Sequence, residues 1–183
     1  MNGFVINVNM AGVERMKSLL LHAPKLLEQA MKNIRKEVLK AAKKSAASRA
    51  SEEYFIKKSG VTREMTLRGD SLVLRGYRQN LADYKMSPKR PGYRKNGITG
   101  AVMREGGMKK IPSGFVIRGK SSGKILGMIR TGKPRKAYKA LISPAVPQLM
   151  ENPRVQEGVV RDTEEAVRLT AANETAKALR MWR

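Results

Sequence analysis

Residues 114–121 match a nucleotide-binding motif letter for letter. They read Gly-Phe-Val-Ile-Arg-Gly-Lys-Ser, which fits the P-loop pattern of two spaced glycines followed by lysine and serine. In a working P-loop a strand comes first, the loop between the glycines curls around phosphate, and a helix follows. Here the intervening Phe-Val-Ile-Arg is typical of a strand, and a turn and a second strand-like run follow. We therefore expect no nucleotide site and no cofactor here.

Few other side chains have the types and spacing that catalysis or metal binding needs. The chain has no cysteine and one histidine, which excludes disulfides, thiolate nucleophiles and multi-histidine metal sites. His22 lies beside a predicted helix break with no serine or cysteine motif near it, so we predict a structural or solvent-facing role. Asp162, Glu164 and Glu165 cluster in a predicted helix, but a single helical carboxylate pair binds Mg²⁺ only with further donors. We predict ion pairing there and no enzyme activity.

The chain carries a large excess of positive charge. Its formal net charge is +23, and residues 84–140 hold sixteen Lys and Arg against one acid, Glu105. Such a field suits an anionic partner, either nucleic acid or an acidic protein face, although it is also typical of a solvated surface. No zinc-finger or RNA-recognition motif accompanies it, so any DNA contact is expected to be non-specific and salt-sensitive. Our candidate partner-facing or DNA-facing cations are Lys85, Lys89, Arg90, Arg94, Lys95, Lys109 and Lys110.

Hydrophobic periodicity predicts the elements that position these residues. We expect a strand at residues 4–10, a helix at 12–21 and a long helix at 24–53. Strands are expected at 71–77, 98–104, 113–118 and 124–130, the last two joined by a turn at 119–123. A final helix at 153–182 starts from Asn152 as N-cap and Pro153. The fold class is α+β, with a long N-terminal helix packed on a small antiparallel sheet of about four strands and a C-terminal helix.

The chain divides into two parts. Residues 1–150 form the α+β domain, with an exposed basic loop at 86–97, because two prolines and four cations there argue against burial. Residues 151–183 form the final helix, which packs either on a neighbouring subunit or on the chain's own sheet. No apolar run approaches the roughly 20 residues of a membrane span, and no signal peptide is recognisable. The final helix has a thin apolar stripe, which consists of Val155, Val159, Ala166, Leu169, Ala176 and Leu179.

Several runs, taken in order, resemble one protein family. An Ala/Lys/Ser-rich helix at 40–51 is followed by Leu-Val-Leu-Arg-Gly at 72–76 and by the run Leu-Ala-Asp-Tyr-Lys-Met-Ser-Pro-Lys-Arg-Pro at 81–91. Then come Ile-Pro-Ser-Gly-Phe-Val at 111–116 and Ser-Pro-Ala-Val-Pro-Gln-Leu at 143–149, the most specific piece. This series, roughly residues 30–155, is similar to the minor tail protein Z, or tail completion, family of tailed bacteriophages. The family often has glycine where Ser143 stands.

The resemblance implies a structural virion protein at the neck, the head-proximal end of a phage tail. Its role there would be tail assembly, head–tail joining and positioning of the DNA end, after assembly in the cytoplasm of the bacterial host. It implies a ring-forming homo-oligomer, expected to be a hexamer, with tail terminator, tail tube and head-connector proteins as partners. The alternative is a non-specific nucleic-acid-binding basic protein of a bacterial cell. Our candidate subunit-interface residues are Pro144, Pro147, Gln148, Asp162 and Glu165.

Overall fold

The computed structural model describes residues 11–21, 23–69, 71–92, 96–132 and 137–182. The strand predicted at residues 4–10, His22, Arg94 and Lys95 lie outside the described residues. The helices are α1 (Ala11–Leu19), α2 (Pro24–Glu53), α3 (Lys58–Arg63), the 3-10 turn η1 (Leu81–Asp83), α4 (Val146–Met150) and α5 (Pro153–Trp182). The strands are β1 (Met65–Arg68), β2 (Ser71–Leu74), β3 (Gln79–Asn80), β4 (Lys85–Ser87), β5 (Ile98–Ala101), β6 (Lys109–Ile111), β7 (Gly114–Arg118), β8 (Ile125–Arg130), β9 (Tyr138–Ala140) and β10 (Ile142–Ser143).

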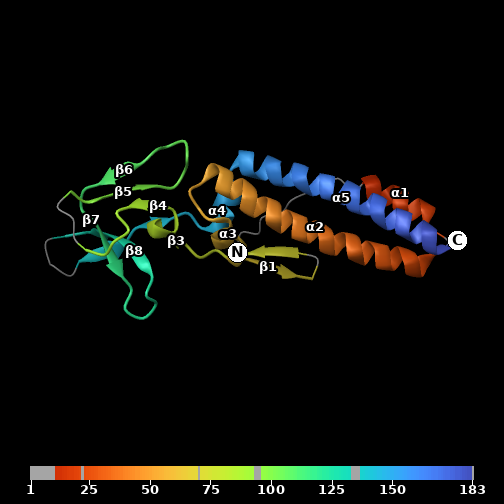
Figure 1. Cartoon of the computed structure of the whole chain (residues 1–183), viewed down its shortest axis with the longest axis horizontal. Coiled ribbons are helices and arrows are strands. Elements are labelled where there is room, and N and C mark those ends of the chain that lie inside the picture. Colours follow the sequence, from red (N-terminus) through yellow and green to blue (C-terminus); the bar gives the residue numbers. More distant parts are fainter. Residues whose placement is uncertain (1–10, 22, 70, 93–95, 133–136, 183) are drawn as a thin grey trace.

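Two long helices, α2 and α5, lie side by side and form one half of an elongated molecule (Figure 1). Each begins with a proline, whose missing N–H has no partner to lose in the first helical turn. Before α5, Oδ1 of Asn152 accepts a hydrogen bond from the backbone N–H of Arg154 at 3.0 Å. The predicted start and end of both helices are confirmed, as is the mixed α+β fold class.

The buried face of α5 matches the predicted apolar stripe at Val155 and Val159 and departs from it further along the helix. Leu169, Ala176 and Leu179 are exposed, and the helix packs on α2 and α1 rather than on a sheet. Small side chains let the helix axes approach closely, and the buried hydroxyl of Thr163 donates to the Val159 carbonyl at 2.6 Å. A search for large apolar residues alone therefore selects the wrong face. The residues that α5 buries are Val155, Gly158, Val159, Thr163, Val167, Ala171, Glu174 and Ala178.

The described strands form four small antiparallel sheets rather than one; three of these lie in the other half, and the fourth, the β1–β2 ribbon, lies beside α2 (Figure 1). The four sheets are the ribbon β1–β2, the pair β3–β10, and the three-stranded sheets β4-β5-β6 and β7-β8-β9. In Figure 1 the strands β4 to β8 lie at the end of the molecule opposite the C-terminus. Residues 114–121, which match the P-loop pattern, form strand β7 and part of a hairpin turn. In this turn Gly119 N–H donates to the Lys124 carbonyl at 2.8 Å. A strand, β8, follows the turn, as the sequence predicts.

The loop predicted as exposed at residues 86–97 is partly structured. Met86 is buried within β4 and pairs with Gly100 of β5. Gly92 N–H donates to the Val116 carbonyl at 2.9 Å, which ties the middle of the loop to β7. The expectation that the exposed loop begins at residue 86 is therefore wrong, because an alternating strand pattern before Pro88 buries Met86. Lys89 and Arg90 are exposed, as predicted.

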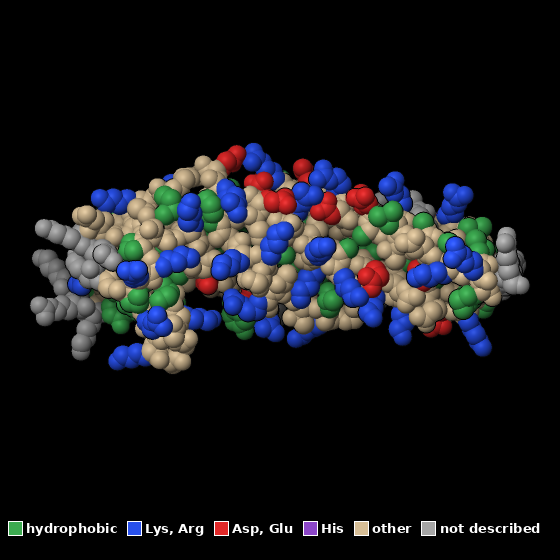
Figure 2. Space-filling model, in the orientation of Figure 1, with side chains coloured by type: hydrophobic (Ala, Val, Ile, Leu, Met, Phe, Trp, Pro, Cys, Tyr) green, Lys and Arg blue, Asp and Glu red, His purple; other side chains and the backbone are tan. Residues whose placement is uncertain are grey.

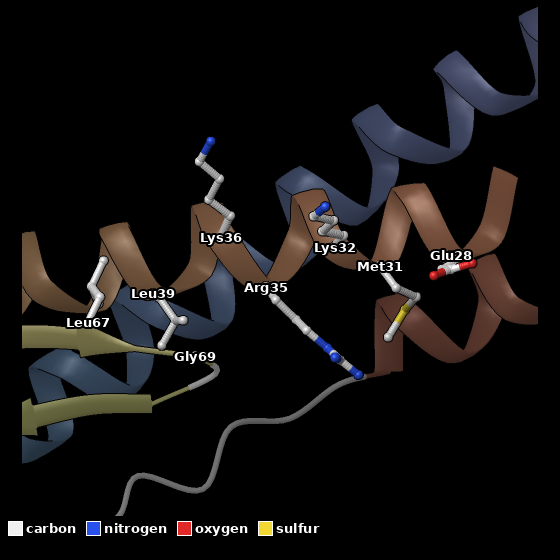
Figure 3. Close-up of a pocket in the computed structure, with 8 residues that line it drawn as sticks. All are labelled: Glu28, Met31, Lys32, Arg35, Lys36, Leu39, Leu67 and Gly69. Atoms are coloured by element: carbon white, nitrogen blue, oxygen red, sulfur yellow. The ribbon is translucent and has the colours of Figure 1, made fainter. Parts of the chain in front are cut away.

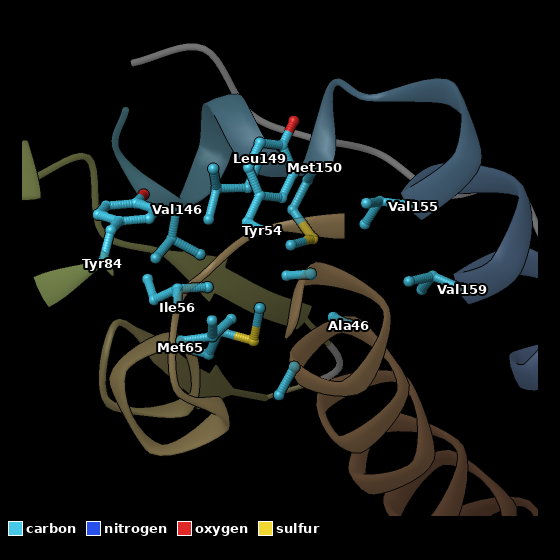
Figure 4. Close-up of a cluster of buried hydrophobic side chains, with 13 residues drawn as sticks. Ala46, Tyr54, Ile56, Met65, Tyr84, Val146, Leu149, Met150, Val155 and Val159 are labelled. Atoms are coloured by element: carbon cyan, nitrogen blue, oxygen red, sulfur yellow. The ribbon is translucent and has the colours of Figure 1, made fainter. Parts of the chain in front are cut away.

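A buried cluster joins the two halves (Figure 4). The hydroxyl of Tyr84 donates to the Pro144 carbonyl at 2.8 Å, and burial raises the pKa of Tyr84. The chain enters and leaves the sheet-rich half at one point, because β3 pairs with β10 and Leu81 N–H donates to the Leu141 carbonyl at 2.9 Å. The cluster comprises Ala46, Ala47, Ala50, Tyr54, Ile56, Val61, Met65, Tyr84, Val146, Leu149, Met150, Val155 and Val159.

Candidate basic interface

Three of the predicted cations lie on one small sheet. Lys85 belongs to β4 and Lys109 and Lys110 to β6, the two edge strands that flank β5. Because side chains alternate between faces, the register puts Lys85 and Lys110 on one face and Lys109 on the other, beside Met86. The sheet therefore brings Lys85 and Lys110 together, and all three lysines are exposed to an anionic partner.

Lys85 also takes part in a contact that links the sheet to the end of α2. Its Nζ lies 4.6 Å from the centroid of the Phe55 ring, and the Arg104 guanidinium carbon lies 4.8 Å from the same centroid. Arg104 is held there, since its Nε donates to the Ser51 carbonyl at 3.0 Å. Cations over an aromatic face are attracted by the ring quadrupole. Sequence reasoning missed Phe55 and Arg104, because nothing in the local pattern indicates that residues so far apart meet.

A hollow of about 470 Å³ lies between α3 and the segment that contains η1 and β4. Lys89 lines it together with Lys57 and Arg63, and Phe55 and Tyr84 contribute aromatic walls. The Nε of Arg63 lies 3.2 Å from the carboxylate of its neighbour Glu64. Three cations and one acid, Asp83, thus line a hollow with aromatic walls, and among the predicted cations that the structure describes, Lys89 lines it.

A second hollow, of about 720 Å³, lies between α2 and the tip of the β1–β2 ribbon (Figure 3). Met31 and Leu39 of α2 and Leu67 of β1 supply its apolar side chains. One face of α2 supplies the polar rim, consisting of Glu28, Lys32, Arg35 and Lys36. The helical spacing of these residues is visible in the sequence. That the tip of the β1–β2 ribbon lies over them is visible only in the fold.

The predicted interface prolines hold the chain's own junction together. The Pro144 carbonyl accepts the Tyr84 hydroxyl, and Pro147 lies in the first turn of α4. The side-chain oxygen of Gln148 accepts a hydrogen bond from Ala145 N–H at 3.0 Å, which caps the same helix. Gln148 is exposed and Pro144 and Pro147 are half-buried, so this run presents part of its surface outward.

The two predicted interface acids have different surroundings. Asp162 accepts from Arg49 of α2 twice, at 2.7 and 3.0 Å, and from the Ser45 hydroxyl at 2.7 Å. The hydrogen bond from Arg49 and then that from Ser45 hold the pKa of Asp162 below its ordinary value, against the opposing effect of burial. Glu165 is exposed on the outer side of α5. Asp162 therefore fastens α5 to α2 within one chain, and Glu165 is the one turned outward.

Replacing Asp162 with asparagine is expected to lower the free energy of unfolding by about 1–2 kcal/mol near neutral pH. This loss lies between those typical of exposed and of fully buried ion pairs. The folded pKa of Asp162 is lowered, so its stabilisation is complete above the unfolded pKa of about 3.9 and disappears as pH falls through the folded value. The deficit of the variant should shrink as pH falls below about 3.9 and vanish once the folded carboxyl group is protonated. Urea titrations across this range measure it, with Glu157→Gln on the same helix as control; a pH-independent deficit contradicts the assignment.

Lysine and arginine side chains cover the whole length of the face in Figure 2, and acidic side chains gather along its middle, over α2 and α5. Among the described residues, no group of three or more histidine, aspartate or glutamate side chains is arranged to hold a metal ion. In the same part of the chain, no helix has the length and apolarity that crossing a membrane requires.

No family model matches the chain, and neither a curated protein nor a solved structure matches it.

Proposed function

We propose that this chain is a structural subunit of a bacteriophage tail, a tail completion protein at the head-proximal neck that joins tail to head without catalysis. The observation that carries the proposal is where the family-like runs meet in the fold. Residues 111–116 span β6 and β7, residues 81–91 span η1 and β4, and residues 143–149 cross the junction. The Tyr84 hydroxyl bond to the Pro144 carbonyl ties residues 81–91 to 143–149, and β5, which pairs with both β4 and β6, links residues 81–91 to 111–116.

The surface of the chain supports a role in which it binds between other subunits. A ring assembled head to tail uses two different patches on each subunit. The sheet-rich half offers exposed lysines, among them Lys85, Lys89 and Lys110, and α5 offers exposed acids at Glu157 and Glu165. Patches of opposite sign attract and fix the register of such contacts. We propose that these patches meet in a homo-oligomeric ring, expected to be a hexamer, at the tail neck of the virion.

Inactivating the gene in a phage that encodes this chain tests the proposal. Heads filled with DNA and separate tails should accumulate, and electron micrographs should show few joined particles. Supplying the intact chain from a plasmid should restore joining. Particles of normal yield and normal neck structure in the absence of the chain would contradict the function.

Reversing the charge of the basic loop is expected to abolish that restoration. The fourfold variant carries Lys89→Glu, Arg90→Glu, Arg94→Glu and Lys95→Glu. It should fold, because Lys89 and Arg90 are exposed and no apolar residue is replaced, yet it should lower particle yield by at least about tenfold if the loop contacts acidic partners. The matched control makes the same charge change on four exposed lysines of α2, namely Lys25, Lys32, Lys36 and Lys44. Equal yields from the two variants would remove the loop from the mechanism.

The second candidate, a non-specific nucleic-acid-binding protein, is favoured by the cationic hollow that Lys57, Arg63 and Lys89 line. A protein that neutralises several phosphates loses affinity steeply with added salt. Fluorescence anisotropy with duplex DNA at increasing salt separates the two functions. Submicromolar binding by the isolated chain with a steep salt slope favours the second candidate, whereas weak binding together with the head–tail defect favours the first.

A further inference from the structure

The outer face of α5 carries a row of exposed apolar side chains. Leu169, Ala172, Ala176 and Leu179 follow one another at spacings of three, four and three residues. Leu169 is 54% exposed and Leu179 is 37% exposed, whereas the inner face of the same helix is covered by α2 and α1 (Figure 1). We call these four residues the outer seam. The four side chains are neighbours on one helix face, and contiguous exposed apolar side chains, unlike scattered ones, mark interaction surfaces.

The spacing of the outer seam is that of the contact positions in a two-helix coiled coil. Alternating steps of three and four residues keep a stripe facing a partner helix, and each side chain inserts between side chains of that partner. The two alanines at the centre let two backbones approach closely, and the two leucines fill the space at either end. A partner helix with the same spacing and the same sizes in reverse order fits this face. A second copy of α5, running antiparallel, has both.

Antiparallel pairing produces a consistent set of contacts. Leu169 of one copy lies against Leu179 of the other, and Ala172 lies against Ala176, so the four layers repeat about a two-fold axis. A two-fold contact uses the same patch on both copies. None of the segments that the structure describes has to move, because α1 and α2 occupy the opposite side of α5.

Charges at the ends of the outer seam select the antiparallel direction. Glu165 lies one turn before Leu169 in line with the seam, and Arg180 lies beside Leu179; both are exposed. In an antiparallel pair Glu165 of each copy comes next to Arg180 of the other, which forms two ion pairs. In a parallel pair Glu165 would face Glu165 across the seam, and like charges at such positions are unfavourable.

We propose that the outer seam is a self-association surface, through which two copies of this chain pair by antiparallel α5 helices. The contact joins two copies rather than closing a ring, and because it uses Glu165, which the proposed ring contact also uses, it forms between chains outside the assembled ring. Because the interface is one helix wide, it belongs to the small, weak class. The net charge of +23 on each copy opposes it at low salt, so pairing strengthens as salt screens the repulsion.

Sedimentation of the purified full chain tests the proposal. The expected result is a monomer–dimer equilibrium that shifts toward dimer when salt rises from about 0.05 to about 0.5 M. Ala172→Glu should abolish the dimer, whereas Gln156→Glu, an equal change at an exposed site elsewhere on α5, should leave it unchanged. Circular dichroism checks that both variants remain helical. A chain that stays monomeric at about 0.2 mM in high salt, or a dimer that survives Ala172→Glu, overturns the proposal.

A charge exchange then tests the antiparallel direction. Glu165→Arg and Arg180→Glu should each weaken the dimer about fivefold. The double variant should recover the original dissociation constant to within about twofold, because the exchange restores both ion pairs. If the double variant is weaker than either single variant, the direction is wrong and the proposal fails.

Engineered cysteines give a second test of direction, since the chain has no cysteine of its own. Chains carrying Ala172→Cys and chains carrying Ala176→Cys, labelled with tags of different size, are mixed and oxidised gently. Antiparallel pairing predicts the mixed disulfide between the two as the main product. Disulfides that form mainly between identical variants would instead indicate parallel pairing and overturn the proposal.

Discussion

Replacing Leu149 with alanine is expected to lower the free energy of unfolding by about 2–5 kcal/mol. Leu149 is fully buried in the cluster that joins the helical half to the sheet-rich half (Figure 4). It projects from α4, whose other buried side chains, Val146 and Met150, enter the same cluster. The variant leaves a cavity that closely packed neighbours fill only in part, so the transfer and cavity costs add. Urea unfolding followed by circular dichroism measures the loss.

The matched control for Leu149→Ala is Leu21→Ala. Leu21 is 70% exposed, so the same change there should alter stability by less than about 0.5 kcal/mol. Because Leu149 holds the two halves together, its loss should also expose the junction to proteases at concentrations of denaturant that leave the intact chain uncut. Equal stability of the two variants would mean that the junction cluster does not hold the halves together.

Replacing Gly97 with alanine is expected to cost about 3 kcal/mol or more, the sum of backbone strain and steric overlap. Gly97 has φ +71°, a conformation that side chains with a Cβ rarely adopt. An added Cβ would also overlap the carbonyl oxygens of Ile111 and Pro112. These are backbone atoms at the end of β6 and in the turn that follows it, so relief requires this backbone to move away from the start of β5, with which β6 pairs. Thermal unfolding and urea titration measure the loss.

Two further glycines divide this cost into its parts. Gly107 has φ +61° but open space around it, so Gly107→Ala should cost only the strain, about 1 kcal/mol. Gly76 has neither strain nor a near neighbour, so Gly76→Ala should be neutral or stabilising by up to about 1 kcal/mol. Losses from Gly97→Ala no larger than those from Gly107→Ala would show that the backbone of residues 111–112 does not approach Gly97 as closely as described.

The sequence predicts the helices of this fold better than its sheets. Proline at the first position, the Asn152 cap and sustained helical periodicity are local signals, and they set the bounds of α2 and α5. The short strands carry the same kind of local signal at the hairpin of residues 113–130. Their grouping into four sheets depends on long-range pairs such as β3 with β10, which no local pattern contains.

The candidate interface could likewise be predicted only where its signal is local in the sequence. The excess of cations in residues 84–140 is visible in the sequence, and the exposure of Lys89, Arg90, Lys109 and Lys110 agrees with it. The position of Lys85 over Phe55 cannot be seen in the sequence, because it depends on how the sheet meets the end of α2. The inner face of α5 could not be identified from the sequence either, because alanine, threonine and glutamate are among the residues buried there while leucines are exposed on the outside.

The pairing of β3 with β10 has an evolutionary consequence. Since the backbone leaves the helical half and returns to it at neighbouring strands, insertions or deletions in the outer loops of the intervening stretch, away from Tyr84 and from residues 102–104 at the end of α2, leave the helices undisturbed. The two regions are thus free to diverge at different rates. Descendants of this gene can remodel the sheets to follow a changing partner while inheriting the helices intact.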